Sequence, residues 1–343
     1  MLDYLVKNSI NLSFNHFDFT QSDFSGLDLN TCLEIGAWFL STGSNDRHID
    51  LSSCDIDKRP FIPSIKHGRA CVFCLNPDEE DSWVSIKGIG WTYGGPVVLP
   101  SPKDNELVFG LYDRESAKRE FEVSARLSFL KIESPMVLGY VTLNSKNLPE
   151  LLTGVSTVKY NSGRYVKPSL LYTKVKSPFR ITDLQFMEYE DRFRIVTKTA
   201  NTMGTDLSNY FKEFGYRLGN KVGEYHAVGC VNDMLDAGNI TLCGEIVDYE
   251  WFCIPNIPLP DGASGLDNIE CRKEKEIIYG IEALLLLNAY LKLNYSFYDI
   301  LNVFISGYEK SYEHINNLAE VLKSRTKLVF KINYIKGLSH AKV

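Results

Sequence analysis

Residues 115–143 read ESAKREFEVSARLSFLKIESPMVLGYVTL, and this stretch decides the fold class of the chain. Phe121, Ala125 and residues 127–130 recur at helical spacing among alternating acids and bases, which predicts one amphipathic helix. The run MVLGYVTL follows Pro135 and is rich in residues that favour a strand. The chain is therefore expected to place a single helix next to a sheet.

The residues before this helix form short strand-like runs separated by Asp, Pro, Gly and Asn. The runs are GRACVFCL (68–75), SWVSIKGIG (82–90), VVLP (97–100) and ELVFGLY (106–112). This pattern predicts a small antiparallel sheet. A sheet, one helix and then more sheet is the element order of the smaller lobe of a protein kinase.

From about Leu151 onward the sequence predicts mostly helices. Apolar residues at a 3.6-residue period mark the runs 207–229, 276–293, 296–315 and 316–331, and a β-like insertion at 240–254 interrupts them. We therefore expect an α+β, bilobal, protein-kinase-like fold. Its parts are an N-terminal extension (1–60), a β-rich N-lobe (61–150) and a helical C-lobe with C-terminal helices (151–343).

The predicted extension, residues 1–60, is polar and irregular, with a short helix expected around LNTCLEIGAWFLS (29–41). The N-terminus has no signal-peptide pattern, and the longest apolar run, residues 281–291, contains Glu282 and Asn288. These features favour a cytoplasmic protein without a membrane span. Eight scattered cysteines are expected to be free thiols, as suits a reducing compartment.

Composition excludes some partner classes. The 343 residues are 44% hydrophobic and 23% charged, which is typical of a soluble globular protein. The net charge of -6 argues against nucleic acid as the main partner, because binding to phosphate backbones requires a basic surface.

Four residues are candidates for ATP chemistry. Transfer from ATP needs a cation on the phosphates, an acid that holds this cation, and oxygen ligands for Mg²⁺ or Mn²⁺. Lys87 ends the strand WVSIK, and Glu120 lies on the following helix. Asn239 and Asp248 flank a predicted hairpin, where two ligands can converge on one ion.

These residues carry a resemblance to the selenoprotein O family of protein adenylyltransferases. Five blocks occur in the family's order: HGRA (67–70), IKGIG (86–90), REFEVS (119–124), LLYTKVKSPFR (170–180), and an Asn-x8-Asp pair ending at Asp248. The resemblance covers roughly residues 62–255. Members of this family have a kinase-like fold, bind ATP in a flipped orientation and transfer AMP to protein hydroxyls.

The resemblance implies a role for each matching residue. Lys87 and Glu120 would form the ion pair that positions the phosphates, beside Gly88 and Gly90 of the same turn. Asn239 and Asp248 would hold Mg²⁺ or Mn²⁺. Two further cations, Lys174 and Arg180, would contact the outer phosphates.

The chain departs from the family at the catalytic acid, which precedes the metal-binding asparagine. That position is Gly238 here, and Asp236 or Asp233 is expected to replace the missing acid. His226, before this loop, is expected to order the loop backbone rather than to transfer protons.

Several functions remain open from the sequence. AMP transfer to a hydroxyl of a protein or peptide is the leading hypothesis. A small-molecule or peptide kinase is an alternative in the same class. A nucleotide-binding pseudoenzyme that acts as an interaction module, or a scaffold, would belong to other classes.

Overall fold

The computed structural model divides the chain into two compact units. The N-terminal unit comprises Met1–Arg126 and Pro135–Pro178, and the C-terminal unit comprises Leu127–Ser134 and Phe179–Val343. The residues that the structure describes are 3–11, 17–24, 39–50, 62–64, 67, 69–74, 83–89, 112–144, 146–147, 165–232, 235–259 and 269–312.

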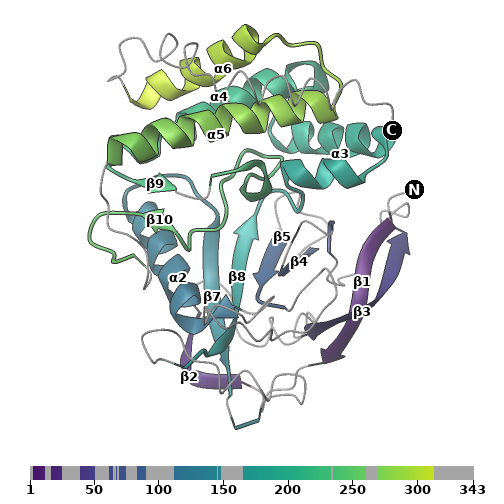
Figure 1. The fold of residues 1–343 in the computed structure, drawn as a ribbon, viewed down its shortest axis with the longest axis vertical. Helices are drawn as coiled ribbons and strands as arrows, with labels where there is room; N and C mark the ends of the chain where they lie inside the picture. The colour runs from purple at the N-terminus through teal and green to yellow at the C-terminus, as the bar shows by residue number, and fades with distance from the viewer. Residues whose placement is uncertain are drawn as a thin grey trace, which may run out of the picture. The chain divides into compact units, whose positions relative to one another are not determined.

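The N-terminal unit contains a six-stranded antiparallel sheet in the order β2-β7-β8-β5-β4, with β6 paired to β8 (Figure 1). The strands are β2 (Phe17–Phe24), β4 (Ala70–Cys74), β5 (Trp83–Lys87), β6 (Tyr112–Asp113), β7 (Met136–Leu143) and β8 (Pro168–Val175). The antiparallel sheet predicted from the strand-like runs is confirmed. The run VVLP and residues 106–111 lie outside the described residues.

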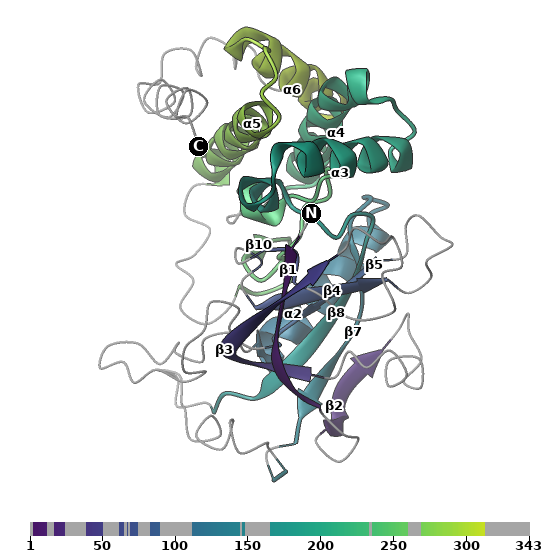
Figure 2. The ribbon, with the colours of Figure 1, turned by 90° about the vertical axis from the view of Figure 1, so that its right-hand side faces the viewer.

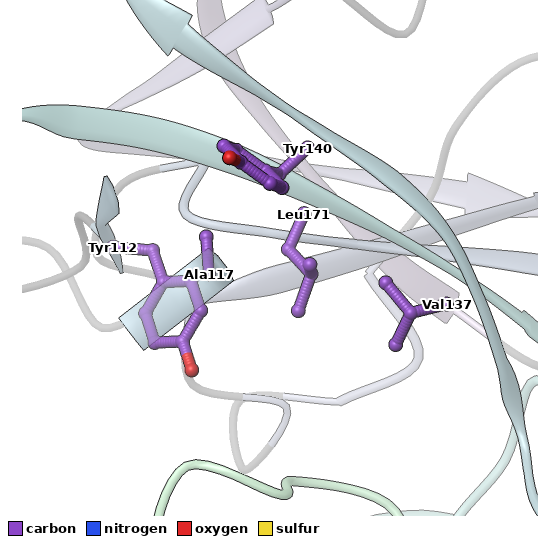
Figure 3. Packing of buried hydrophobic residues seen from close by; sticks show 5 residues of the cluster. All are labelled: Tyr112, Ala117, Val137, Tyr140 and Leu171. Carbon is purple, nitrogen blue, oxygen red and sulfur yellow. The ribbon is translucent and has the colours of Figure 1, made fainter. Parts of the chain in front are cut away.

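Helix α2 (Arg114–Phe129) packs on this sheet, as its periodicity predicted. A buried cluster joins helix and sheet (Figure 3), and Phe121 packs against it. Its members are Tyr112, Ala117, Val137, Tyr140 and Leu171. Removing these apolar side chains from water is what holds an amphipathic helix against a sheet.

The first 60 residues contain strands, so the expectation of an irregular extension is wrong for three segments. Strand β1 (Asp3–Asn11) pairs antiparallel with β3 (Phe39–Asp50), and β2 pairs with β7 in the main sheet. Strand β2 is an edge strand of this sheet, and its Phe17 side chain is buried in the core. The helix predicted at 29–41 falls mostly outside the described residues, and its last three residues belong to β3.

Strand β8 belongs to the N-terminal unit because it pairs with both β7 and β5. This unit extends to Pro178, beyond residue 150, where the sequence placed the start of the helical lobe. The boundary differs from the predicted one because β8 pairs with strands that lie far from it in the sequence.

The C-terminal unit is mainly helical, as predicted (Figure 2). Its helices are α3 (Tyr189–Thr202), α4 (Leu207–Ala227), α5 (Ile269–Tyr290) and α6 (Phe297–Ser311). Asp206 caps α4 by accepting a hydrogen bond from the Asn209 amide, and Ser296 with Asp299 forms a capping box on α6. The helical run 316–331 lies outside the described residues.

Short elements complete this unit. They are η5 (Ile181–Phe186), β9 (Val231–Asn232), η6 (Ala237–Asn239) and β10 (Phe252–Cys253). The six cysteines within the described ranges are free thiols, as predicted. No helix in the described part of the chain is long and apolar enough to cross a membrane.

Candidate functional site

The predicted ion pair between Lys87 and Glu120 forms in the N-terminal unit. Lys87 ends β5, Glu120 lies on α2, and the Lys87 Nζ is 2.6 Å from the Glu120 Oε1. The two side chains are 12% and 3% exposed. In a pair this well buried each charge stabilises the other, because burying either charge without its partner would destabilise the fold.

Two residues that the sequence hypothesis gave no role complete this group. The Tyr112 hydroxyl donates a hydrogen bond to the same Glu120 oxygen. The Lys87 Nζ and the Arg69 Cζ lie 4.2 and 4.4 Å from the centroid of the Tyr112 ring. We call Arg69, Lys87, Tyr112 and Glu120 the lysine cluster. It holds two cations and one carboxylate around one aromatic ring.

Arg69 could have been found from the HGRA block, because this block precedes the strand that ends at Lys87. No local pattern marked Tyr112. Its role depends on β6 pairing with β8, which places it beside α2.

Gly88 follows Lys87 with φ of +101°. A Cβ at this position would lie 2.3 Å from the Ser169 carbonyl oxygen, so only glycine fits beside β8. The amides of Gly88 and Ile89 both donate to the Arg69 carbonyl. These contacts fix the turn directly after Lys87. The other predicted turn residue, Gly90, lies outside the described residues.

The sheet register places Lys174 on the face opposite Lys87. Lys87 pairs with Leu171, a member of the cluster beneath α2. Lys174 lies three residues further along β8 and pairs with Val84. Because side chains alternate between the two faces of a strand, an odd separation puts Lys174 on the other face. The structure therefore does not bring these two lysines together on one face of the sheet.

Arg180 is fixed against the predicted hairpin in the C-terminal unit. Its Nη1 donates to the Gly238 carbonyl over 2.9 Å, and its backbone amide donates to the Asp183 carboxylate over 2.7 Å. The Ile181 amide also donates to the Ile240 carbonyl. The guanidinium is thus positioned by the turn that carries Gly238.

Asn239 and Asp248 flank a hairpin, as predicted. Ile240 and Ile246 form an antiparallel bridge, and the Val247 amide donates to the Asn239 carbonyl over 2.9 Å. Asn239 is buried, and Asp248 has φ of +69°, a region that residues other than glycine rarely adopt. Such strained residues are concentrated at functional sites.

Asp236 lies beside Gly238, the position of the family's catalytic acid. Its Oδ1 accepts a hydrogen bond from the Gly238 amide over 2.6 Å, and it lies 2.9 Å from where a Cβ on Gly238 would be. A carboxylate from two residues upstream therefore lies next to the position that an acid at 238 would use. Asp233, the other expected substitute, lies outside the described residues.

Desolvation by burial raises the pKa of Asp236 above its ordinary value. The Gly238 amide and the Arg180 charge oppose this shift, and the Asp248 charge adds to it. The carboxyl is thus enclosed by protein on one side although the residue as a whole reaches solvent. A raised pKa makes a carboxylate a better proton acceptor. We call Arg180, Asp236, Asn239 and Asp248 the hairpin cluster.

The donor atoms of the hairpin cluster fit a hard divalent cation. Asn239 and Asp248 offer an amide and a carboxylate, the oxygen ligands that Mg²⁺ and Mn²⁺ prefer. Within the described ranges, no group of three or more His, Cys, Asp or Glu side chains gathers as a metal site. Mg²⁺ commonly takes only one or two protein carboxylates and completes its shell with substrate phosphates and water.

His226, expected to order the loop backbone, is buried in a hydrogen-bond network. Its Nε2 is 2.7 Å from the Glu276 Oε2, and its Nδ1 is 2.7 Å from the Tyr308 hydroxyl. Glu276 also accepts from the Asn232 amide, which connects His226 to the start of the site loop. Burial lowers the pKa of His226 to about 3, with Lys273 contributing, so the ring is neutral at pH 7.

Comparison with known proteins gives little further support. No family model matches the sequence, and no curated protein matches it. Among solved structures, the chain is similar to a Stt7 homolog from Micromonas algae, whose crystals were soaked with ATP. The two share 14% identity over 80% of this chain and 84% of that chain, with a TM-score of 0.36. At that level the similarity carries no argument, and the site rests on its own geometry.

Proposed function

We propose that this chain is an ATP- and metal-dependent transferase with a protein-kinase-like arrangement, which moves AMP to a hydroxyl of a protein or peptide. In this proposal the N-terminal unit is the β-rich lobe and the C-terminal unit is the helical lobe. The lysine cluster is proposed as the phosphate-binding element of the N-terminal unit, and the hairpin cluster as the metal-binding element of the C-terminal unit.

The buried ion pair between Lys87 and Glu120 carries this proposal. A lysine at a strand end has no structural need for a partner on the neighbouring helix, since exposed lysines lose little by remaining in water. Here the pair is 2.6 Å long and almost fully buried. Holding an ammonium group in one fixed place is the requirement for binding phosphates in ATP-dependent transfer.

The hairpin cluster supplies the remaining chemistry. A cation held by Asn239 and Asp248 would neutralise phosphate charge. The acceptor oxygen forms a bond to the α-phosphorus, the bond to pyrophosphate breaks, and the acceptor proton passes to the Asp236 carboxylate. Arg180 would bind a phosphate oxygen, while one of its nitrogens stays on the Gly238 carbonyl.

The choice of AMP over a phosphoryl group rests on the resemblance to the selenoprotein O family. With attack at the γ-phosphorus, the same residues would serve a kinase. Gly238 favours a second candidate function, a nucleotide-binding pseudoenzyme, because the acid of the family is missing there. The Asp236 carboxylate beside Gly238 supports an active enzyme instead.

Labelled ATP distinguishes these functions. Purified protein is incubated with Mg²⁺ or Mn²⁺ and ATP labelled at either the α- or the γ-phosphate, and products are identified by intact mass. Movement of the α-label indicates AMP transfer, and movement of the γ-label alone indicates a kinase. If neither label moves but ATP raises the melting temperature, the chain is a pseudoenzyme.

Asp248→Ala is the variant that tests the site, and Asp23→Ala, at an exposed position of β2, is its matched control. We expect the first to abolish transfer and the second to leave it unchanged. Full transfer by Asp248→Ala would refute the proposed metal site.

A further inference from the structure

The hydroxyl of Tyr112 has no role in the function proposed above, although it reaches the ion pair that carries that function. Tyr112 begins β6 and is fully buried in the cluster beside α2. Its hydroxyl donates a hydrogen bond to the Glu120 Oε1, the same oxygen that lies 2.6 Å from the Lys87 Nζ. Rotation of the Glu120 carboxylate would break both contacts at once. The tyrosine hydroxyl therefore fixes the oxygen that holds the lysine.

The ring of Tyr112 contacts the lysine as well. The Lys87 Nζ lies 4.2 Å from the centroid of this ring, within the range in which an aromatic face attracts a cation. The ammonium group thus has a carboxylate oxygen and an aromatic ring as neighbours, and Tyr112 supplies the ring and binds the carboxylate. A single residue contacts both members of the ion pair.

The packing of the backbone explains how Tyr112 reaches this place. A Cβ on Gly88 would lie 3.0 Å from the Tyr112 Cβ, so the absence of a side chain at Gly88 lets β6 approach the turn after Lys87. Tyr112 also pairs with Ser169 of β8, and its ring belongs to the buried cluster beneath α2 (Figure 3). Sheet and helix both hold the tyrosine, which makes it a rigid support for a flexible side chain.

A lysine that binds phosphate benefits from such a support. Lysine side chains are long and flexible, and the conformational entropy that they lose on binding opposes association. A lysine that is already ordered in the free protein loses less entropy when the phosphate arrives, so the ligand binds more tightly. The contacts of Tyr112 with Glu120 and Lys87 exist in the protein without any ligand.

We propose that Tyr112 is a positioning residue for ATP binding, an inference that rests on the proposed function. Its hydroxyl fixes the Glu120 carboxylate, and the carboxylate and the ring hold the Lys87 ammonium in one place, where it binds a phosphate of ATP. Tyr112 acts through Lys87 and needs no contact with the nucleotide. Because the ammonium binds the phosphate both before and during transfer, loss of its position weakens ATP binding more than it slows the bound complex.

Tyr112→Phe tests this role, because it keeps the ring and removes only the hydroxyl. Tyr140→Phe is the matched control: Tyr140 belongs to the same buried cluster, and its hydroxyl has no hydrogen bond within the described residues (Figure 3). The position of Lys87 is read in the free protein by NMR with ¹³C-labelled lysine, and Lys87→Arg identifies its signal by the loss of that signal. Protons this close to an aromatic ring are shifted upfield by the ring current.

We expect the Lys87 signal to lie upfield of the position of an exposed lysine in the wild type and in Tyr140→Phe, and to move toward that position in Tyr112→Phe. The dissociation constant of Mg·ATP, measured by calorimetry, should rise about tenfold in Tyr112→Phe, the effect of one lost hydrogen bond to a charged group. The KM for ATP should rise with it, while kcat changes less than about twofold. Tyr140→Phe should leave all of these values unchanged.

Several results would overturn the inference. An unchanged Lys87 signal in Tyr112→Phe would show that the hydroxyl does not hold the lysine in place. A displaced signal with unchanged ATP affinity would show that the position of the lysine does not serve binding. An equal loss of affinity in Tyr140→Phe would assign the loss to packing of the cluster. If the wild type binds no Mg·ATP although its Lys87 signal is shifted upfield, the proposed function itself fails, and the role in ATP binding fails with it.

Discussion

An exchange of the acid between positions 236 and 238 tests the catalytic assignment most directly. Asp236→Ala removes the carboxylate, Gly238→Asp introduces one at the family position, and the double variant carries both changes. Asp236→Asn serves as a milder form, because its amide oxygen can still accept from the Gly238 amide.

The structure sets the expected magnitudes. A positioned general base contributes about 10²–10⁴-fold, or about 3–5 kcal/mol of transition-state stabilisation. We expect Asp236→Ala and Asp236→Asn to lose this factor. In Gly238→Asp the new Cβ would lie 2.9 Å from the Asp236 Oδ1, too close for an undisturbed contact, and two carboxylates would repel. This single variant should also lose activity.

The double variant should recover part of the rate, because Asp236→Ala frees the space that the new side chain needs. Initial rates of label transfer from ATP measure the effect, with melting temperatures as the control for folding. In the wild type the acid limb of the pH–rate profile should lie above 3.8, since burial raises the pKa of Asp236 and the base is lost as pH falls through it. Full activity of Asp236→Asn would refute the assignment.

Two further predictions concern stability. Glu120→Ala leaves the Lys87 ammonium largely buried without its carboxylate and should lower the free energy of unfolding in urea by about 3 kcal/mol. The control Glu122→Ala removes an exposed carboxylate 3.8 Å from Lys118 and should lower it by under about 0.5 kcal/mol. Equal losses of stability in the two variants would contradict the argument from burial. Because the pKa of His226 is lowered to about 3 in the folded chain, the imidazole is protonated at a higher pH in the unfolded chain than in the folded one. The free energy of unfolding should therefore fall by up to about 1.4 kcal/mol per pH unit as pH drops from 6.5 toward 3. His226→Gln should flatten this pH dependence, and an unchanged dependence would exclude His226 as its cause.

Local sequence signals located α2 and α4–α6 but not α3, and the resemblance to a known family implied the ion pair. Apolar residues at a 3.6-residue period predicted α2 and α4–α6, because a helix buries one stripe of its own surface. The order of the motifs placed Lys87 on a strand and Glu120 on the next helix, and the two side chains meet. Asn239 and Asp248 likewise flank the predicted hairpin.

Long-range pairing was not predictable from these signals. Strand β2 lies in a stretch that was expected to be irregular, yet it pairs with β7 more than 100 residues away in the chain. Lys174 lies in the block LLYTKVKSPFR, which implied that it contacts phosphates as Lys87 does. The register of β8 against β5 instead places it on the face of the sheet opposite Lys87. A strand's register depends on its neighbour, so no single segment encodes it.

The sequence by itself determined α2 and α4–α6, the chemical identity of the candidate residues and their order along the chain, because period and residue type are local properties. Only the tertiary structure decided which of them meet. It brought Tyr112 and Arg69 to Lys87, and it placed the Asp236 carboxylate beside Gly238. Such contacts depend on how strands and turns pack in three dimensions, which no local pattern specifies.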